Sequence, residues 1–144
     1  MTIRPDIPTE TGDSIPPGGC WHLLSTARIG RLAVLVRHEP LVFPVAHVVE
    51  DHTIAFRVHA GEILLGVTAH PRVTFEVDEV DVATGRGWSV LAKGDAEVTY
   101  EPPARDGAVS HPTSTWLVAI HPTEVTGRGV ILPAPRRRLT RRTR

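Results

Sequence analysis

Short segments rich in branched apolar residues follow one another through most of this chain, and this pattern restricts it to a mainly β fold. Turn-forming residues stand at 38–40 and 50–52, so the first three segments are expected to form an antiparallel meander. The six expected strands are Ile29–Arg37, Leu41–Val49, Thr53–Val58, Arg72–Asp78, Gly87–Tyr100 and Thr115–Thr126. Strands of this number and spacing are typical of a small closed or partly split antiparallel barrel.

Two short helices are expected beside these strands, over Gly18–Ala27 and Glu62–Ala69. The second is expected to end at Ala69 because the following His70-Pro71 pair disfavours helical backbone. Apolar and polar residues alternate along Arg72–Asp78, so one face of this strand is expected in the core and its acidic face in water. Gly94, inside the longest strand, predicts a bulge or a bend.

The length of 144 residues fits one domain with two polar ends. Residues 1–17 hold several prolines and little apolar surface, so we expect a flexible N-terminal arm. Residues 18–132 are expected to form the folded domain. Residues 133–144 are rich in arginine and predict a flexible basic tail, which can contact a polyanion weakly through charge alone.

Charge and cysteine content exclude several classes of protein. The 16 basic and 16 acidic side chains cancel, so no overall field favours nucleic acid or a membrane surface. Cys20 is the single cysteine, which excludes an intrachain disulfide, and the histidines lack the spacing of a zinc site. No apolar run approaches the roughly 20 residues that span a bilayer, and the N-terminus lacks the apolar region of a signal peptide. We therefore expect a cytoplasmic protein without a bound metal.

One expected strand ends on Arg57 and runs into a loop, His59–Gly61, before the second helix. A cation beside free backbone N–H groups suits a bound phosphate, so a small anionic cofactor is the leading hypothesis. The alternative is that Arg57 is an ordinary surface arginine paired with Glu76 or Glu62.

The order of these elements resembles the pyridoxamine 5′-phosphate oxidase-like, FMN-binding split-barrel family, and in particular its short actinobacterial-type members. The resemblance spans roughly residues 20–127 and rests on seven short motifs in the correct order. They are Cys20-Trp21-His22-Leu23-Leu24, Gly30-Arg31-Leu32-Ala33, Pro44-Val45, Ile54-Ala55-Phe56-Arg57, Val73-Thr74-Phe75-Glu76-Val77-Asp78, Gly87-Trp88-Ser89-Val90 and Val125-Thr126-Gly127. The resemblance implies a six-stranded antiparallel split barrel with short helices, forming a homodimer with FMN in clefts at the interface.

The resemblance also assigns site residues, position by position. It places the flavin ring beside residues 44–47, its phosphate on Arg57, and two further contacts on the neighbouring strand. Val58, Glu62 and Ile63 stand where typical members have a threonine and a Gly-Thr-Lys motif, and this loss weakens dianion binding by about 1.5–3 kcal/mol per charge-assisted hydrogen bond. The candidate cofactor-binding residues are Pro44, Val45, Ala46, His47, Arg57, Val58, His59, Glu62, Ile63, Trp88 and Ser89.

The implied function is an FMN-dependent oxidoreductase acting on an unidentified small molecule, with the flavin rather than a side chain carrying the chemistry. Two alternatives stay open. One is a deazaflavin-dependent reductase whose phosphate contacts come from Arg31, Arg72 and Lys93. The other is a non-enzymatic dimeric ligand-binding or interaction module, which the altered phosphate positions favour. Histidine ligation of haem, which the resemblance also allows, is less favoured than a flavin.

Overall fold

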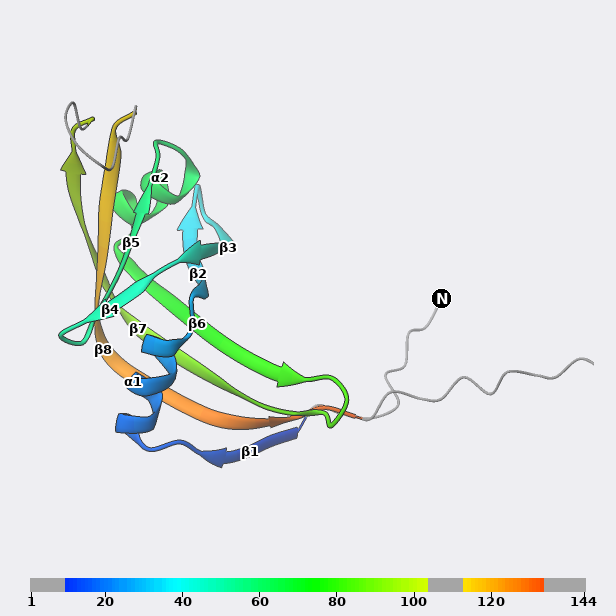
Figure 1. Ribbon diagram of the computed structural model, residues 1–144. Coiled ribbons are helices and arrows are strands. Elements are labelled where there is room, and N and C mark those ends of the chain that lie inside the picture. Colours follow the sequence, from blue (N-terminus) through cyan, green and yellow to red (C-terminus); the bar gives the residue numbers. More distant parts are fainter. Residues whose placement is uncertain (1–9, 104–112, 134–144) are drawn as a thin grey trace, which may run out of the picture.

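The computed structural model describes residues 10–103 and 113–133, which hold two helices and one eight-stranded antiparallel sheet (Figure 1). The elements are β1 (Glu10–Ser14), α1 (Pro17–Thr26), β2 (Ile29–Val36), β3 (Glu39–Ala46), β4 (Val48–Glu50), β5 (Thr53–Val58), α2 (Glu62–Ala69), β6 (Arg72–Asp81), β7 (Arg86–Glu101) and β8 (Thr115–Ile131). Neither helix is long and apolar enough to cross a membrane.

The sheet curls so that the chain joins its two ends. Its strands are hydrogen-bonded in the order β3-β2-β6-β7-β8-β5-β4, and β1 adds to β8. The first and last strands of this order, β3 and β4, follow each other in sequence with only His47 between them. The chain therefore passes from one end of the sheet to the other across a seam where the described strands form no β3–β4 ladder. This is a split barrel.

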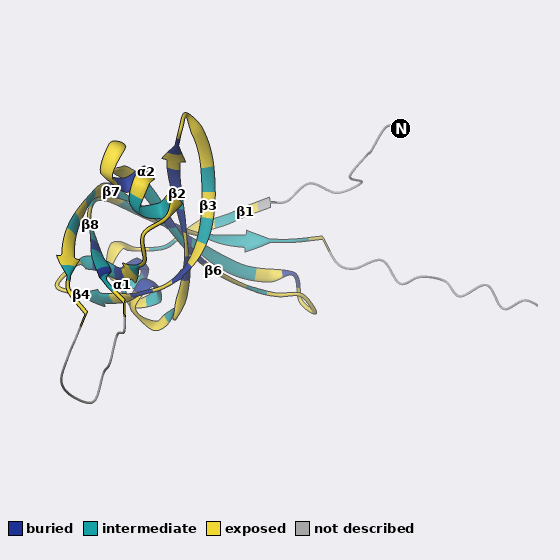
Figure 2. Cartoon of the chain, turned by 90° about the horizontal axis from the view of Figure 1, so that it is seen from above, coloured by how far each residue is buried: buried dark blue, intermediate teal, exposed yellow. Residues whose placement is uncertain are grey.

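The inward faces of the strands supply the core. In β2, Leu32, Val34 and Val36 are buried, whereas the residues between them are exposed or half-buried (Figure 2). Phe75 of β6 is fully buried, with its ring centroid 6.4 Å from that of Phe56. This two-residue alternation is the one that the sequence predicts for strands with a single buried face.

Two tight turns connect neighbouring antiparallel strands. Arg37 and His38 join β2 to β3, and Asp51 and His52 join β4 to β5. All four residues have positive φ angles, from 47° to 69°. Positive φ at both central residues is the mark of type I′ turns, whose twist matches that of the strands. The first turn thus comes earlier than expected, and residues 39–40 belong to β3.

The structure corrects the expected count of six strands. The segment expected as one strand over 41–49 divides at His47 into β3 and β4. In addition, Glu10–Ser14, which was expected to belong to a flexible arm, forms β1 against β8. β1 has no apolar alternation; Gly12 instead lets it approach Gly129, whose Cα would lie 3.2 Å from a Cβ at Gly12. Residues 15 and 16 of the predicted arm connect β1 to α1, and Pro17 begins that helix, whereas residues 1–9 and residues 134–144 of the basic tail lie outside the described residues.

The expected irregularity at Gly94 is confirmed. The β7–β8 register shifts between Lys93 and Gly94, so that Gly94 faces Pro122 and Thr123 is extra on β8. A Cβ at Gly94 would contact the backbone carbonyl of His121, so only glycine fits without movement. Proline is tolerated at such a bulge, and β8 continues beyond Pro122 instead of breaking there.

The helices close the barrel from different sides. α2 has the bounds that the sequence predicts and packs on β2, where Gly66 allows close approach (Figure 1). A Cβ at Gly66 would lie 2.9 Å from the carbonyl oxygen of Leu35. α1 packs against β8 and β4, so its C-terminal end lies near the seam at His47.

Candidate functional site

A depression of about 440 Å³ lies where β3, the end of β5 and the start of α2 meet. We call it the Arg57 depression. Its walls bring together most of the candidate residues: it is lined by Phe43, Pro44, Val45, Ala46, Arg57, Val58, His59, Gly61, Glu62 and Ile63. Two segments distant in sequence, 43–46 and 57–63, thus share one surface.

A second depression, of about 710 Å³, adjoins the first on the side of α1. We call it the α1-side depression. It is lined by Ser25, Ala27, Arg28, Ala46, His47, Val48, Val49, Ala55, Phe56, Arg57 and Leu117. Because Ala46 and Arg57 line both, the Arg57 guanidinium stands at the boundary between the two depressions.

The Arg57 guanidinium is held by a carboxylate. Its Nε donates to Oε2 of Glu101 at 2.7 Å, and its Nη2 donates to Oε1 at 3.2 Å. The hydroxyl of Thr115 donates to the same Oε2 at 3.3 Å. The hydrogen bond with Glu101, and then its charge, raise the pKa of Arg57, so this side chain stays cationic.

The expected ion-pair partners of Arg57 were wrong. Within the described residues Glu76 pairs with Arg31 and Arg57 pairs with Glu101, whereas Glu62 lines the Arg57 depression. Glu101 was missed because its approach depends on register: Arg57 pairs with Leu117 on β8, and β8 in turn aligns with the end of β7. No local pattern in the sequence carries that information.

His47 is buried in the wall of the α1-side depression, with 8% of its surface exposed. Its Nε2 lies 2.9 Å from the carbonyl oxygen of Leu24, and because a carbonyl only accepts, Nε2 is the donor. Leu24 lies in the last turn of α1, where carbonyls lack helical partners, so His47 caps this helix. The Nδ1 of His47 is buried and has no hydrogen-bond partner among the described residues.

The start of α2 lines the Arg57 depression and affects whether an anion can bind there. Gly61 is its N-cap residue, and no side chain caps the first turn. Uncapped N–H groups at the positive end of a helix favour an anion. Glu62 occupies that first turn and already places a negative charge there. His59 is exposed, and its Nδ1 lies 3.4 Å from the carbonyl oxygen of Ser114.

Trp88 and Ser89 line neither depression. They lie on β7 opposite Glu79 and Asp78 of β6. The Ser89 hydroxyl donates to Oε1 of Glu76 at 3.3 Å. In the single chain these two candidates therefore belong to a different surface from Arg57.

That surface carries a three-residue charge network on the outward face of β2 and β6. Nη1 of Arg31 donates to Oε2 of Glu76 at 3.2 Å and to Oδ1 of Asp78 at 3.1 Å. Burial raises the pKa of Glu76, and the neighbouring Asp78 raises it further, which outweighs the opposing effect of Arg31. The expected outward placement of this acidic face is confirmed.

The other cations proposed for a larger cofactor are also paired. Arg72 lies 3.9 Å from Asp95, and Lys93 lies 3.7 Å from Glu124, atom to atom across the ion pairs. Neither lines a depression beside Arg57. Arg28, by contrast, was not singled out from the sequence, yet it is exposed and lines the α1-side depression.

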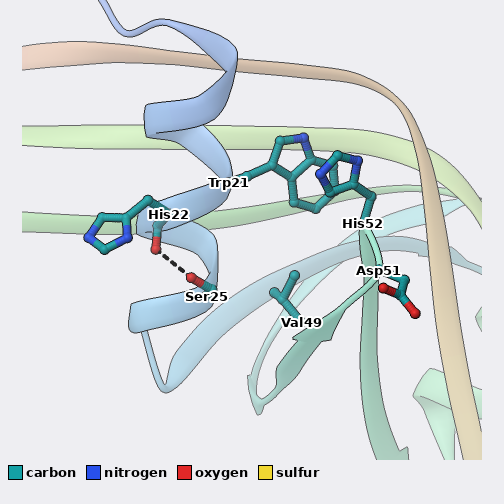
Figure 3. A pocket seen from close by; sticks show the side chains of 6 residues that line it. All are labelled: Trp21, His22, Ser25, Val49, Asp51 and His52. Atoms are coloured by element: carbon teal, nitrogen blue, oxygen red, sulfur yellow. Dashed lines mark hydrogen bonds between the residues drawn. The ribbon is translucent and has the colours of Figure 1, made fainter.

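A third depression, of about 610 Å³, lies between α1 and the β4–β5 turn (Figure 3). There the indole of Trp21 stacks on the His52 ring, with centroids 4.5 Å apart and planes inclined by 10°. Figure 3 also shows the Ser25 hydroxyl turned back to the His22 carbonyl, to which it donates at 2.7 Å. These contacts tie α1 to the turn.

Neither the possible metal ligands nor the Cys20 thiol forms a reactive centre in the described part of the chain. No group of three or more histidine, cysteine, aspartate or glutamate residues could hold a metal ion there. Cys20 is fully buried, and burial raises the pKa of its thiol, which keeps it protonated and unreactive.

Comparison with known proteins finds one matching family model and solved structures with the same fold. Residues 17–129 match the family model for pyridoxamine 5′-phosphate oxidase. The chain is 31% identical to the FAD-binding protein from Mycobacterium smegmatis, with a TM-score of 0.60, covering 81% of this chain and 96% of that one. No curated protein matches the chain.

Two other solved structures share the fold at lower identity. The FAD-binding protein from Mesorhizobium loti is 23% identical, with a TM-score of 0.67, over 81% of this chain and 96% of that one. The flavocytochrome Anf3 from Azotobacter vinelandii is 13% identical, with a TM-score of 0.64, over 91% of this chain and 87% of that one. At these identities the likeness shows the fold alone.

Proposed function

The chain belongs to the pyridoxamine 5′-phosphate oxidase family, and from this premise we propose that it is a flavin-binding oxidoreductase holding FMN in the Arg57 depression. Its substrate is a small molecule that the chain does not identify. The observation that carries the proposal is the composition of this depression, which combines an apolar wall, one cation and an uncapped helix start. Similarity to an FAD-binding protein at 31% identity supports a flavin.

The residues present fit a flavin ring better than they fit its phosphate. Pro44, Val45 and Ile63 offer apolar surface for a ring, and Arg57 with the N–H groups that begin α2 offers donors for a phosphate. Glu62 and Glu101 oppose a dianion at the same place. When bound, a flavin supplies hydride or electron transfer. This chain's own residues would bind it, orient it and keep water from one face.

We further propose that the protein is a homodimer. Support comes from the outward face of the β2–β3 hairpin, where cross-strand partners such as Ala33 and Val42 are apolar. Val42 is 63% exposed and Ile29 is 57% exposed. Exposed apolar residues grouped on one face, here beside Arg31, favour an interaction surface, and a second copy of the chain is the partner that the family implies.

The first test is the visible spectrum of the purified protein, before and after FMN or FAD is added and the excess removed by gel filtration. A retained flavin band is expected, and Arg57→Ala should lose retained FMN while the oligomeric mass stays unchanged. Arg72→Ala is the matched control, because Arg72 lines neither depression. Failure of the wild-type chain to retain either flavin would overturn the proposal.

A non-enzymatic module is the second candidate, favoured by the carboxylate already bound to Arg57 and by the altered residues Val58, Glu62 and Ile63. It predicts that no flavin is retained. A deazaflavin reductase predicts retention of a deazaflavin coenzyme, although Arg31, Arg72 and Lys93 are paired with carboxylates. A Soret band in the same spectrum would indicate haem.

The cytoplasmic location and the weak contact of residues 133–144 with a polyanion remain proposals. Cell fractionation tests the location. Comparison of heparin retention between the full chain and a chain ending at residue 132 tests the contact, which predicts earlier elution of the shortened chain as salt rises.

A further inference from the structure

We propose that Glu101 determines which ligands the Arg57 depression accepts, by competing with a ligand phosphate for the Arg57 guanidinium. The inference rests on the proposed function, since it concerns the same depression. Glu101 lies outside all seven of the short motifs on which the family resemblance rests.

Glu101 occupies one edge of the Arg57 guanidinium. A guanidinium offers a planar fork of donors, and Glu101 engages two of them, Nε at 2.7 Å and Nη2 at 3.2 Å. A phosphate that approaches this Nε–Nη2 edge in the bidentate manner must displace Glu101. The Glu101 carboxylate is itself positioned by a hydrogen bond from the hydroxyl of Thr115, a buried residue that is 5% exposed. Ligand phosphate and Glu101 therefore cannot both hold Arg57 by its Nε–Nη2 edge.

The charges at the depression also disfavour a phosphate. Arg57 is the one cation lining the depression among the described residues, and Glu62 lines it as well. Once Glu101 neutralises Arg57, the remaining charge at the depression is the negative charge of Glu62. A phosphomonoester dianion that takes the Nε–Nη2 edge must displace one carboxylate and lie beside another, whereas the flavin ring meets neither cost.

This competition predicts that the depression discriminates between ligands by their phosphate and not by their flavin ring. FMN and riboflavin carry the same ring and differ by the phosphate, so their affinity ratio reports the competition directly. Arg57 is 54% exposed, so solvent screening limits the effect. We expect Glu101→Gln to tighten FMN binding about fivefold, the equivalent of about 1 kcal/mol, and to leave riboflavin binding unchanged.

The experiment titrates both flavins into the wild-type chain, Glu101→Gln and the matched control Glu97→Gln. Glu97 lies on the same strand and accepts from His121 at 3.2 Å, but lines neither depression. Thr115→Val is a second variant, which loosens Glu101 without removing it and should shift the FMN-to-riboflavin ratio in the same direction by a smaller factor. An equal change for both flavins, or no change in either variant, would overturn the inference.

A second readout separates this inference from the proposed function. Inorganic phosphate is titrated into ¹⁵N-labelled protein while the side-chain Nε–H signal of Arg57 is followed, with Arg57→Lys used to assign it. The signal should respond at lower phosphate concentration in Glu101→Gln than in the wild type. If no variant retains a flavin but this difference is present, the proposed function fails and the inference stands. If flavin binds and the phosphate response is the same in both, the inference alone fails.

Discussion

The imidazole of His47 joins three parts of the barrel at its seam. Its side chain bonds the end of α1 through Leu24, its backbone N–H donates to the carbonyl of Arg28 at 3.3 Å, and its ring meets Phe75 edge-on at 4.8 Å. The resemblance assigns this residue to the flavin, whereas its contacts make it part of the fold. Both roles are compatible only if the ligand touches the ring without moving it.

Replacement of His47 by leucine keeps much of its volume and removes the donor to Leu24. We expect His47→Leu to lower the free energy of unfolding by about 1–3 kcal/mol, the usual cost of a buried polar group left unsatisfied. Urea denaturation measures this. His59→Leu is the control: His59 is exposed, so its replacement should change stability by less than about 0.5 kcal/mol. Unchanged stability together with lost flavin would instead make His47 a ligand contact.

Glu76 should make the stability of the fold depend on pH. Its folded-state pKa is raised, whereas in the unfolded chain it ionises near the ordinary value of about 4.3. Its contribution to stability is therefore complete below that value and is lost as pH rises through the raised pKa. Glu76→Gln stays neutral, so its stability relative to the wild type should increase as pH rises from about 4 through the raised pKa of Glu76.

Urea unfolding of the wild type and Glu76→Gln at several pH values tests this. Glutamine still accepts from Ser89, and Arg31 keeps Asp78, so the comparison isolates the charge. Ser89→Ala removes the hydrogen bond but keeps the titrating carboxyl, so its stability should still fall as pH rises, as in the wild type. A pH-independent difference for Glu76→Gln would show that burial does not raise the pKa of this carboxyl.

Among the elements, the β7–β8 ladder depends on one glycine. A Cβ at Gly94 would contact the carbonyl of His121 and lie 2.7 Å from the Cα of Pro122, both backbone atoms that cannot rotate away. We expect Gly94→Ala to destabilise the fold by about 1–3 kcal/mol, as overpacking does. Thermal unfolding measures the loss. Gly18→Ala is the control, because nothing lies within 4 Å of a Cβ there, and a similar loss in both variants would contradict the steric argument.

Elements with a strong local pattern follow from the sequence. Alternation located the strand that begins at Arg72, and apolar spacing before His70-Pro71 located α2 at its observed bounds. β1 could not be found in this way, since backbone pairing with β8, and not an apolar face, holds it. The division at His47 also escapes local pattern, because the residues on both sides are equally apolar and the break is set by closure of the barrel.

The candidate site, too, could be predicted only in part from the sequence. Segments 44–46 and 57–63 lie together, as the resemblance implies, because β3 and β5 end beside α2. Glu101 reaches Arg57 only through the register of β5, β8 and β7, which no short motif encodes. Trp88 and Ser89 line neither depression in the single chain, so a role for them at the flavin requires a second chain.

At the scale of the whole molecule, the outward face of the β2–β3 hairpin should decide the oligomeric state. Val42→Asp places a charge on this face opposite Ala33 and removes no core contact, because Val42 is 63% exposed. We expect the light-scattering mass to fall from about twice the chain mass of 15.7 kDa to the monomer value. Val82→Asp is the control: Val82 is 74% exposed in the β6–β7 turn, away from the hairpin. A dimeric Val42→Asp would move the interface elsewhere, and a monomeric wild type would overturn the homodimer.

We expect the same face to couple assembly to ligand binding. Pro44 and Ala46 stand on the outward side of β3, opposite Arg31 and Ile29, and both also line the Arg57 depression. A second copy seated on this face would therefore cover part of the depression and exclude water from a bound ring. We expect Val42→Asp to retain less flavin than the wild type after gel filtration, even though Arg57 and Glu101 are unchanged. A monomeric Val42→Asp that retains as much flavin as the wild type would show that one chain holds the ligand by itself.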